Sequence, residues 1–457
     1  MNWTRLLDAL QWFFLLYFIA INIGYILLNL LSIRALKNYM EAEGLAELPA
    51  HSGYEPPISI LIPAYNEEAR IVDLVRSLLQ LDYPEFEIIV VNDGSKDNTL
   101  AVLQNEFSLV LFPEAYWQRL KGKGVRAIYR SSAHPNLRLI EKEHGGKADA
   151  LNAGINASRY PLFCAVSADS ILQSDSLRRA VQPFLENPLT VASGGAVRIA
   201  NDCEMQNGFL TGIALPKSGL ATMQVVESMR TFLFGAMGWS QLNAVLIISG
   251  AFGLFRKETV IEAGGYLSDT SGEDMELIVR LHHMLRVKGI PYRITFVPDP
   301  IFWTKAPENS RALKTKRVNW QRRLAESLNF NMSLLFNRKG GTVSWLAFPF
   351  VIIFEWLGPM FEVMGYIFMI SGFALKLISW QVFSVFLLVA VGFGMMLSVT
   401  ALLLEELSFT APEVLERVDE LKLHIDRKAA EKMAEVTLYD WETWKSSDVD
   451  QLRSMHR

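Results

Sequence analysis

A long stretch without charges lies near the start of the chain and limits where the chain can fold. Gln11–Ile33 spans 23 residues and contains no charged side chain. As a helix it reaches about 30 Å or slightly more, enough to cross the hydrocarbon core of a bilayer. A cleavable signal peptide, the alternative, has a shorter apolar region followed by a small-residue cleavage site, and neither is seen. We therefore predict a retained N-terminal transmembrane helix within residues 1–40.

A second apolar region occupies residues 343–406. Its first part, Trp345–Leu375, contains two prolines and two acids, Glu355 and Glu362, which we expect on one helix face because they are seven residues apart. Its second part, Val382–Leu404, has no charge. We predict two membrane helices here, or three, with the first one kinked. An interfacial helix at the start of the region is the alternative.

Basic residues close to the spans predict the orientation of the chain. Arg34 and Lys37 follow the first span, and residues 306–340 carry eight basic side chains. Such residues favour the cytoplasmic side. We therefore predict a cytoplasmic domain at 50–340 that ends in interfacial helices, in a multi-pass protein of the cell inner (plasma) membrane. The tail, 407–457, returns to the cytoplasm, and its apolar spacing predicts an amphipathic helix.

The composition excludes several classes of protein. Hydrophobic residues make up 51% of the chain, which is too apolar for a disordered protein. The 44 basic and 48 acidic residues nearly cancel, and the net charge of −4 argues against nucleic-acid binding. The two cysteines cannot form a disulfide framework and indicate a reducing compartment.

Short apolar runs within the predicted cytoplasmic domain alternate with a helical pattern. Ile58–Pro63 and Glu87–Asn92 are predicted strands, and Glu68–Leu79 between them fits a helix. Further strands are predicted at Leu137–Ile140 and Leu162–Val166. The strand–helix–strand order is typical of a parallel sheet in an α/β fold.

Polar segments follow three of these strands directly. The segments are Tyr65, Asn66 and Glu67 after the first strand, Asp93, Gly94 and Ser95 after the second, and Ser167, Ala168 and Asp169 after the fourth. Parallel sheets bind ligands at the carboxyl ends of their strands, so these loops should converge. Acidic loops at one sheet edge predict a site for a sugar nucleotide and its metal.

A series of motifs makes the prediction more specific. In chain order it reads PAYNEE (63–68), VVNDGSKDNT (90–99), HGGKADALNAG (144–154), SADS (167–170), SGAFGLFRKE (249–258), GGY (264–266) and SGEDMELIVRLH (271–282). The series resembles the membrane-embedded family 2 glycosyltransferases, which include cellulose, chitin, hyaluronan and poly-N-acetylglucosamine synthases. The resemblance covers about residues 60–330. It implies a GT-A type Rossmann-like cytoplasmic domain flanked by transmembrane helices.

The resemblance implies roles at the nucleotide end of the site. Asp93 would hold the uracil of a UDP-sugar, with Tyr65 and Glu67 lining the same pocket. Lys147 follows a glycine pair that lets the backbone approach phosphate, and it adds a positive charge. Asp169 matches the second aspartate of the D-x-D motif and would bind Mg²⁺ or Mn²⁺ on the diphosphate. The first aspartate position holds Ser167, which brings no charge, so we expect either weaker metal binding or a relaxed site.

The resemblance also implies a reacting centre. Asp274 matches the catalytic base that takes the proton from the attacking hydroxyl, and Glu273 would support it. Residues 316–320 align with the family's Q-x-x-R-W motif, of which only the tryptophan remains. Trp320 keeps the option of stacking on a sugar, and Arg322 offers a replacement cation. The alternative for this segment is a basic, aromatic helix that lies on the membrane surface.

We therefore expect an inverting, metal-dependent hexosyl or N-acetylhexosaminyl transferase that uses a UDP-sugar in surface or extracellular polysaccharide synthesis. Its acceptor would be a glycan. Transfer of a single sugar to a membrane lipid is one alternative, and a catalytically weakened regulatory subunit that binds nucleotide sugar is another. Three helices are few for a closed polar conduit, so polymer export would call for a homo-oligomer or an export partner.

Overall fold

The computed structural model describes residues 3–43, 55–168, 170–206 and 209–408 of the 457-residue chain. Residues 1–402 form one compact unit, and residues 403–457 form a second, of which only the end of helix α14 is described. The predicted tail at 407–457, with its amphipathic helix, lies almost entirely outside the described residues.

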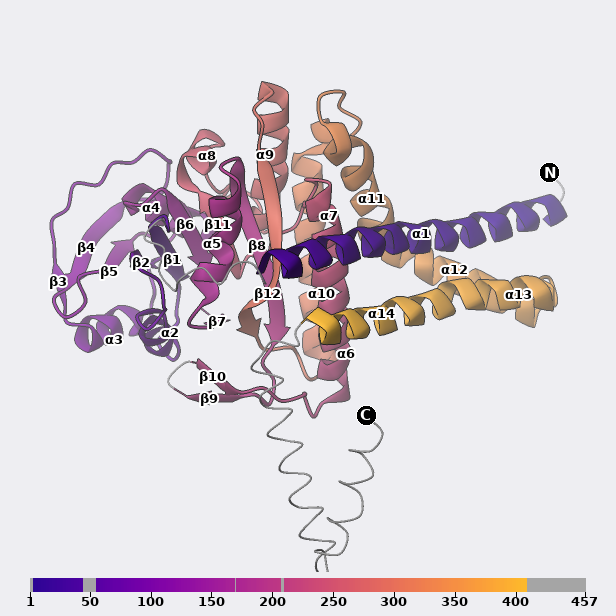
Figure 1. Cartoon of the computed structure of the whole chain (residues 1–457), viewed down its shortest axis with the longest axis horizontal. Coiled ribbons are helices and arrows are strands. Elements are labelled where there is room, and N and C mark those ends of the chain that lie inside the picture. Colours follow the sequence, from indigo (N-terminus) through magenta and orange to yellow (C-terminus); the bar gives the residue numbers. More distant parts are fainter. Residues whose placement is uncertain (1–2, 44–54, 169, 207–208, 409–457) are drawn as a thin grey trace, which may run out of the picture. The chain divides into compact units, whose positions relative to one another are not determined.

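The first unit contains a ten-stranded mixed sheet, from which the apolar helices extend to one side (Figure 1). Four neighbouring strands in the order β5-β2-β1-β6 run parallel. Their bounds are Leu137–Lys142, Phe86–Asn92, Ile58–Ala64 and Leu162–Val166. The four strands predicted from the apolar runs are therefore confirmed, each within two residues of its expected ends.

The other strands extend the sheet at both edges, mostly in antiparallel pairs. Beyond β5 lie β4 and then β3, and beyond β6 the order is β11-β8-β12-β7. The bounds are β3 Leu109–Leu111, β4 Val125–Ser131, β7 Ile171–Leu172, β8 Thr190–Ile199, β11 Phe252–Arg256 and β12 Arg293–Thr304. Strands β9, Glu204–Gln206, and β10, Phe209–Gly212, form a separate hairpin.

Helices cover both faces of the sheet. On one face lie α2 (Ile71–Leu78), α3 (Thr99–Glu106) and α5 (Ser176–Glu186), and on the other lie α4 (Lys147–Ala157), α8 (Lys257–Glu262) and α9 (Glu273–Lys288). Successive β1 side chains alternate between the two cores: Ile60 packs in the α2 core, and Leu61 packs in the α4 and α9 core. A parallel sheet buried on both faces explains why its strands are continuous apolar runs.

Four further helical segments lie between the sheet and the apolar helices. They are α6 (Gly219–Met229), η1 (Arg230–Ala236), α7 (Met237–Gln241) and α10 (Ser310–Phe330). In Figure 1, α10 runs across the direction of the apolar helices. Its second half packs into the core through Leu324 and Leu328, whereas most of its first half is exposed.

The predicted C-terminal apolar region is helical. Its elements are η2 (Met332–Leu334), η3 (Val343–Ala347), α11 (Phe348–Phe350), η4 (Val351–Trp356), α12 (Gly358–Ala374), α13 (Trp380–Leu387), η5 (Leu388–Gly392) and α14 (Phe393–Ser408). Trp380–Leu402 is long and apolar enough to cross a membrane, and the pair Val343–Trp356 and Gly358–Ala374 qualifies as one broken span with a 50° bend. The predicted kink is present. The bend places Glu355 and Glu362 on separate helical segments, η4 and α12.

Helix α1, Trp3–Glu43, is 41 residues long and contains the predicted N-terminal apolar stretch. Its residues 5–39 are long and apolar enough to cross a membrane. The first half packs against α12 and η5, where the Asn22 side chain donates to the Val389 carbonyl at 3.2 Å. The second half packs against η1 and α7, where the Ser32 hydroxyl donates to the Phe234 carbonyl at 2.7 Å. The helix is thus joined to both the apolar bundle and the sheet domain.

Candidate active site

The loops that follow β1 and β2 are bound together at the carboxyl edge of the sheet. The Asn66 N–H donates to Ser95 Oγ at 3.0 Å, and the Lys96 N–H donates to Asn66 Oδ1 at 2.8 Å. The Glu67 N–H donates to Thr99 Oγ1, at the start of α3, at 2.9 Å. The predicted convergence of these two loops is therefore present, and it brings Tyr65, Glu67 and Asp93 to one edge.

Asp93 is buried, and its carboxylate accepts hydrogen bonds from other groups of the protein. Oδ1 accepts from Lys142 Nζ at 2.7 Å and from the Gly145 N–H at 2.9 Å. Oδ2 accepts from the Gly146 N–H at 2.8 Å and lies 2.9 Å from His144 Nδ1. In this structure Asp93 therefore fixes the glycine loop that leads into α4. Its expected contact with uracil stays a prediction.

Lys142 is a buried cation that sequence reasoning missed. Its side chain is fully buried and pairs with Asp93 at the end of β2 and with Asp149 in the first turn of α4. Asp149 Oδ1 also accepts the Lys123 N–H at 3.0 Å. A buried charge needs such partners, because desolvation is otherwise costly. Lys142 therefore joins β5, β2 and α4 at one point.

Two exposed rings lie above this buried cluster. Tyr65 and His144 have ring centroids 4.4 Å apart with planes tilted by 32°. The Tyr65 side chain is exposed, and so is His144. Gly94, in the loop after β2, has φ +65°, and a Cβ there would meet the His144 backbone nitrogen at 2.9 Å. The loop geometry therefore requires glycine at this position.

Lys147 connects the glycine loop to the predicted reacting centre. As the first residue of α4, it pairs through Nζ with Glu273 Oε1 at 2.8 Å and donates to the Gly250 carbonyl at 3.3 Å. Burial opposes its charge, but the carboxylates of Glu273 and Asp274 outweigh that effect and raise the pKa of Lys147. The lysine is therefore held as a cation beside the two acids of the GED motif.

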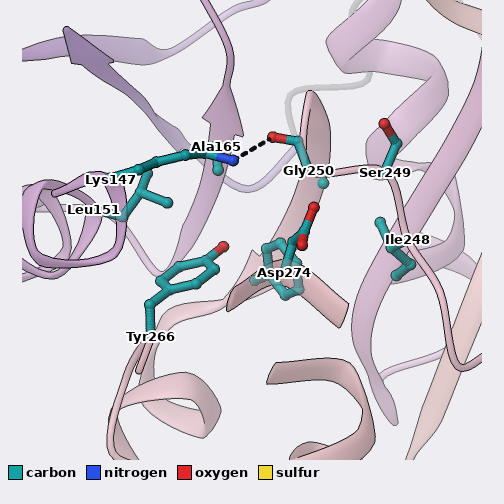
Figure 2. Close-up of a pocket in the computed structure, with 10 residues that line it drawn as sticks. Lys147, Leu151, Ala165, Ile248, Ser249, Gly250, Tyr266 and Asp274 are labelled. Carbon is teal, nitrogen blue, oxygen red and sulfur yellow. Dashed lines mark hydrogen bonds between the residues drawn. The ribbon is translucent and has the colours of Figure 1, made fainter. Parts of the chain in front are cut away.

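Asp274 lies against the backbone of Gly250 in a small pocket (Figure 2). A Cβ on Gly250 would meet Asp274 Oδ2 at 1.8 Å, so only glycine leaves room for the carboxylate. Figure 2 shows Lys147 and Asp274 approaching Gly250 from different sides, with Tyr266 below them. Burial raises the pKa of the Asp274 carboxyl, and the adjacent Glu273 adds to the rise, while Lys147 opposes it. A raised pKa makes a carboxylate a better proton acceptor.

Tyr266 also lines this pocket, and the sequence analysis named it only as part of the GGY motif. It is buried. The Asn152 side chain of α4 makes two hydrogen bonds with its backbone. Asn152 Nδ2 donates to the Tyr266 carbonyl, and the Tyr266 N–H donates to Asn152 Oδ1, both at 2.8 Å. The GGY and GGKADALNAG motifs are therefore joined in space. Their presence in one series was the available signal, but the contact between them depends on the tertiary fold.

The predicted acceptor-side residues lie on α10. Trp320 is partly buried and packs against the core that contains α4 and α9. Arg322 is exposed, and its Nε donates to Glu326 Oε1 at 2.8 Å, so this cation is directed toward its own helix. Arg323 is the arginine whose charge lowers the pKa of Asp274. The role of Arg322 stays a prediction, and Arg323 is the alternative that the structure brings to the base.

The metal prediction rests on Asp169, which lies outside the described residues. Ser167, in the place of the other D-x-D aspartate, is described. Among the residues that the structure describes, no group of three or more His, Cys, Asp or Glu side chains is placed to hold a metal ion. Mg²⁺ is commonly held by one or two carboxylates together with substrate phosphates and water. A metal that arrives with a diphosphate therefore needs few ligands from the chain.

Comparison with known sequences agrees with this arrangement. Residues 59–257 match the family model described as "Glycosyl transferase family 2". The poly-beta-1,6-N-acetyl-D-glucosamine synthase of Staphylococcus epidermidis is 29% identical over 266 residues, which cover 58% of this chain and 53% of that protein. The synthase of the same name from Staphylococcus aureus (strain COL) gives the same identity and coverage. The matched region is thus about half the length of these relatives.

Comparison with solved structures matches a mannosyltransferase and TarS, among others. The mannosyltransferase PcManGT from Pyrobaculum calidifontis, in complex with GDP-Man and Mn²⁺, has a TM-score of 0.44 and 17% identity, covering 81% of this chain and 97% of that chain. TarS 1-349 of S. aureus, in complex with UDP-GlcNAc, has a TM-score of 0.39 and 15% identity, covering 74% and 80%. The α/β sheet with helices on both faces and apolar helices at both ends is the architecture expected from the sequence.

Proposed function

We propose, from the match of residues 59–257 to the family 2 glycosyltransferase model, that this chain is a membrane-anchored glycosyltransferase with a GT-A type domain. It moves a sugar from a UDP-sugar to a hydroxyl of a glycan acceptor, with inversion, in the synthesis of a surface or extracellular polysaccharide. UDP-N-acetylglucosamine is the first donor to test, because the curated relatives are named poly-N-acetylglucosamine synthases. The observation that carries the proposal is the Asp274 carboxylate, seated on Gly250 beside Lys147.

Asp274 is the proposed general base. Its carboxylate takes the proton of the acceptor hydroxyl as the hydroxyl oxygen forms a bond to the anomeric carbon of the donor. The bond between that carbon and the diphosphate oxygen breaks, and the electron pair leaves with UDP. Attack from the face opposite the leaving group inverts the anomeric centre. The raised pKa of Asp274 supports this role, because it increases the affinity of the carboxylate for the proton.

Lys147 is the proposed cation for the departing diphosphate. It sits at the N-terminus of α4, where backbone N–H groups also favour negative charge. Its pairing with Glu273 at 2.8 Å supports a position fixed before the donor arrives. Tyr65 and Glu67 are proposed to line the uridine pocket, whose floor is Asp93.

The proposed metal is Mg²⁺ or Mn²⁺, bound by Asp169 and by the diphosphate of the donor. Such an ion neutralises the charge that develops on the leaving UDP. With Ser167 in the place of a second aspartate, the chain itself supplies little binding energy to the ion. The diphosphate therefore has to supply several of the ligands.

The membrane arrangement follows from the apolar helices and the basic residues near them. We propose that α1 and the C-terminal helices cross the inner (plasma) membrane and that the sheet domain is cytoplasmic. This places the nucleotide site where UDP-sugars are made. A glycan acceptor is favoured over a lipid acceptor by the names of the curated relatives. A regulatory subunit without turnover is disfavoured by the intact group Asp274, Glu273 and Lys147.

The test is UDP release by the full chain purified in detergent. Wild type, Asp274→Asn and a matched control, Asp73→Asn, are incubated with UDP-N-acetylglucosamine, UDP-glucose and UDP-N-acetylgalactosamine, with Mg²⁺, with Mn²⁺ and with EDTA. Asp73 is an exposed acid in the first turn of α2. We expect metal-dependent release from one donor, lost by about 10²-fold or more in Asp274→Asn and retained in the control.

The product and the binding data decide between the alternatives. A polymeric product supports the polysaccharide synthase, and a single sugar on a lipid extract supports the lipid transferase. Saturable UDP binding without release from any donor would favour the regulatory subunit. Release that is equal in wild type and Asp274→Asn would show that Asp274 is not the base.

A further inference from the structure

Glu326 lies on α10 and contacts the loop that leads into the proposed base. Its Oε2 accepts the Ser271 N–H at 2.8 Å, the Ser271 hydroxyl at 2.8 Å and the Thr270 hydroxyl at 3.3 Å. Its Oε1 accepts from Arg322 Nε at 2.8 Å. Gly272, the next residue of the loop, is the N-cap of α9, whose first two residues are Glu273 and Asp274. Glu326 therefore binds the residues that fix the start of α9.

The loop also lies directly against the backbone of α10. A Cβ on Gly272 would meet the Arg323 carbonyl oxygen at 2.7 Å, so no side chain fits between the two segments. The Gly272 N–H donates to Thr270 Oγ1 at 3.1 Å, which closes the turn before the helix. The first turn of α9 is thus oriented from α10 by one carboxylate and one backbone contact.

These hydrogen bonds keep the Glu326 carboxylate charged. The Ser271 N–H and hydroxyl, followed by the Arg322 guanidinium, lower the pKa of Glu326 to about 2. Hydrogen bonds to an ionised acceptor are stronger than those between neutral groups. α10 itself is anchored in the core by Leu324 and Leu328, on either side of Glu326. The carboxylate is therefore held between a fixed helix and the loop that precedes α9.

We propose that Glu326 is a positioning residue. Its hydrogen bonds to Thr270 and Ser271 hold the loop before α9 against α10 and so fix the position of the Asp274 carboxylate. The inference rests on the proposed function, because it concerns the base of that reaction. Since α10 also carries Trp320, predicted from the sequence to stack on a sugar, these hydrogen bonds link that part of the site to the base. A shift of about 1 Å in a reacting group lowers a rate by up to about 10²-fold. Loss of the Glu326 hydrogen bonds should therefore lower kcat and leave donor binding nearly unchanged.

The experiment compares wild type, Glu326→Ala, Glu326→Gln and a control, Glu262→Gln. Glu262 is an exposed acid that also contacts α9, through Lys288 at its opposite end, at 2.6 Å. We measure kcat, KM for the donor, affinity for UDP, and hydrogen–deuterium exchange of the peptide that covers residues 270–276. For Glu326→Ala we expect kcat to fall about 10- to 100-fold. KM and UDP affinity should change little, and amide exchange at 270–276 should be faster.

The conservative variant and a double variant separate positioning from loss of folding. In Glu326→Gln the amide oxygen of the new side chain can still accept from Ser271, so part of the lost kcat should return. In an Asp274→Asn background, Glu326→Ala should cost little further, because residues that act as one unit are not additive. Unchanged kcat or unchanged exchange in a folded Glu326→Ala, judged by normal UDP binding, would overturn the inference. A wild type that turns over no donor would instead overturn the proposed function, and the exchange data would then report only a structural link.

Discussion

At the scale of single residues, Gly250 shows how closely the proposed base is fitted to the backbone. Gly250→Ala would place a Cβ 1.8 Å from Asp274 Oδ2, so the carboxylate would have to move. We expect kcat to fall by about 10²-fold with little change in the melting temperature, because the displaced group is a short side chain that lines a pocket. The control is Gly219→Ala at the start of α6, where nothing lies within 4 Å of the new Cβ. Equal activity of both variants would contradict the assignment of Asp274.

The residues of the site were partly predictable from the sequence. Asp274, Glu273 and Lys147 were singled out by motif, and the structure brings them together. The motif also contained Gly250, but its contact with Asp274 spans 24 positions of the chain and depends on how β11 and α9 pack. The pairing of Arg322 with Glu326 could have been anticipated, because oppositely charged residues four positions apart on a helix are neighbours.

At the scale of elements, the buried lysine Lys142 joins the ends of β5 and β2 to the start of α4. In Lys142→Met, Asp93 and Asp149 would remain buried without their cation. Breaking a buried ion pair on one side costs about 3–5 kcal/mol. We expect a clear fall in the melting temperature and weaker UDP binding, measured by thermal unfolding and titration. Lys96→Met, on the exposed neighbouring loop, is the control.

A second substitution tests whether charge compensation holds the Lys142 cluster together. Asp149→Asn removes one of the two negative charges that Lys142 compensates. Combined with Lys142→Met, it should restore part of the lost stability, because fewer unpaired charges are then buried. A double variant that is less stable than Lys142→Met alone would argue that the cluster is held together by hydrogen bonding to Asp149 rather than by charge.

The predictability of the elements followed their environment. β1, β2, β5 and β6 are parallel and buried on both faces, so their sequences are apolar runs that a pattern search detects. β8 is rich in small residues, and Gly195 gives room to Ile301 of β12, a contact that no local pattern reveals. β12 contains a proline-bearing segment where its register with β8 shifts, and prolines argue against a central strand.

At the scale of the whole molecule, the arrangement across the membrane is the main prediction. With a cytoplasmic sheet domain, the connection between α12 and α13 lies outside the cell. In a Cys203→Ser background, Leu377→Cys should react with a membrane-impermeant maleimide on intact cells. Lys339→Cys should react only after permeabilisation. Both of these residues are exposed, and Cys164 is buried. The opposite labelling pattern would invert the proposed orientation.

The sequence predicted the apolar helices better than their packing. Charge-free length was enough to find α1 and Trp380–Leu402, because a bilayer imposes that length. The break beside Leu357 followed from proline chemistry, but its effect on Glu355 and Glu362 depends on the bend. That half of α1 packs against η1 and α7 was not predictable, since a span and a core helix share the same apolar composition.

The packing of α1 has a practical consequence for protein engineering. Leu28, Ala35 and Leu36 are buried against the rest of the protein, and a Cβ on Gly238 of α7 would meet the Leu28 carbonyl oxygen at 2.7 Å. A fragment cut after α1 to obtain a detergent-free enzyme would therefore uncover part of its own core. Other side chains of the same helix, such as Leu16 and Leu27, are exposed and do not pack in the core. Replacing those outward residues with polar ones, while keeping the helix, is the sounder route to a soluble form.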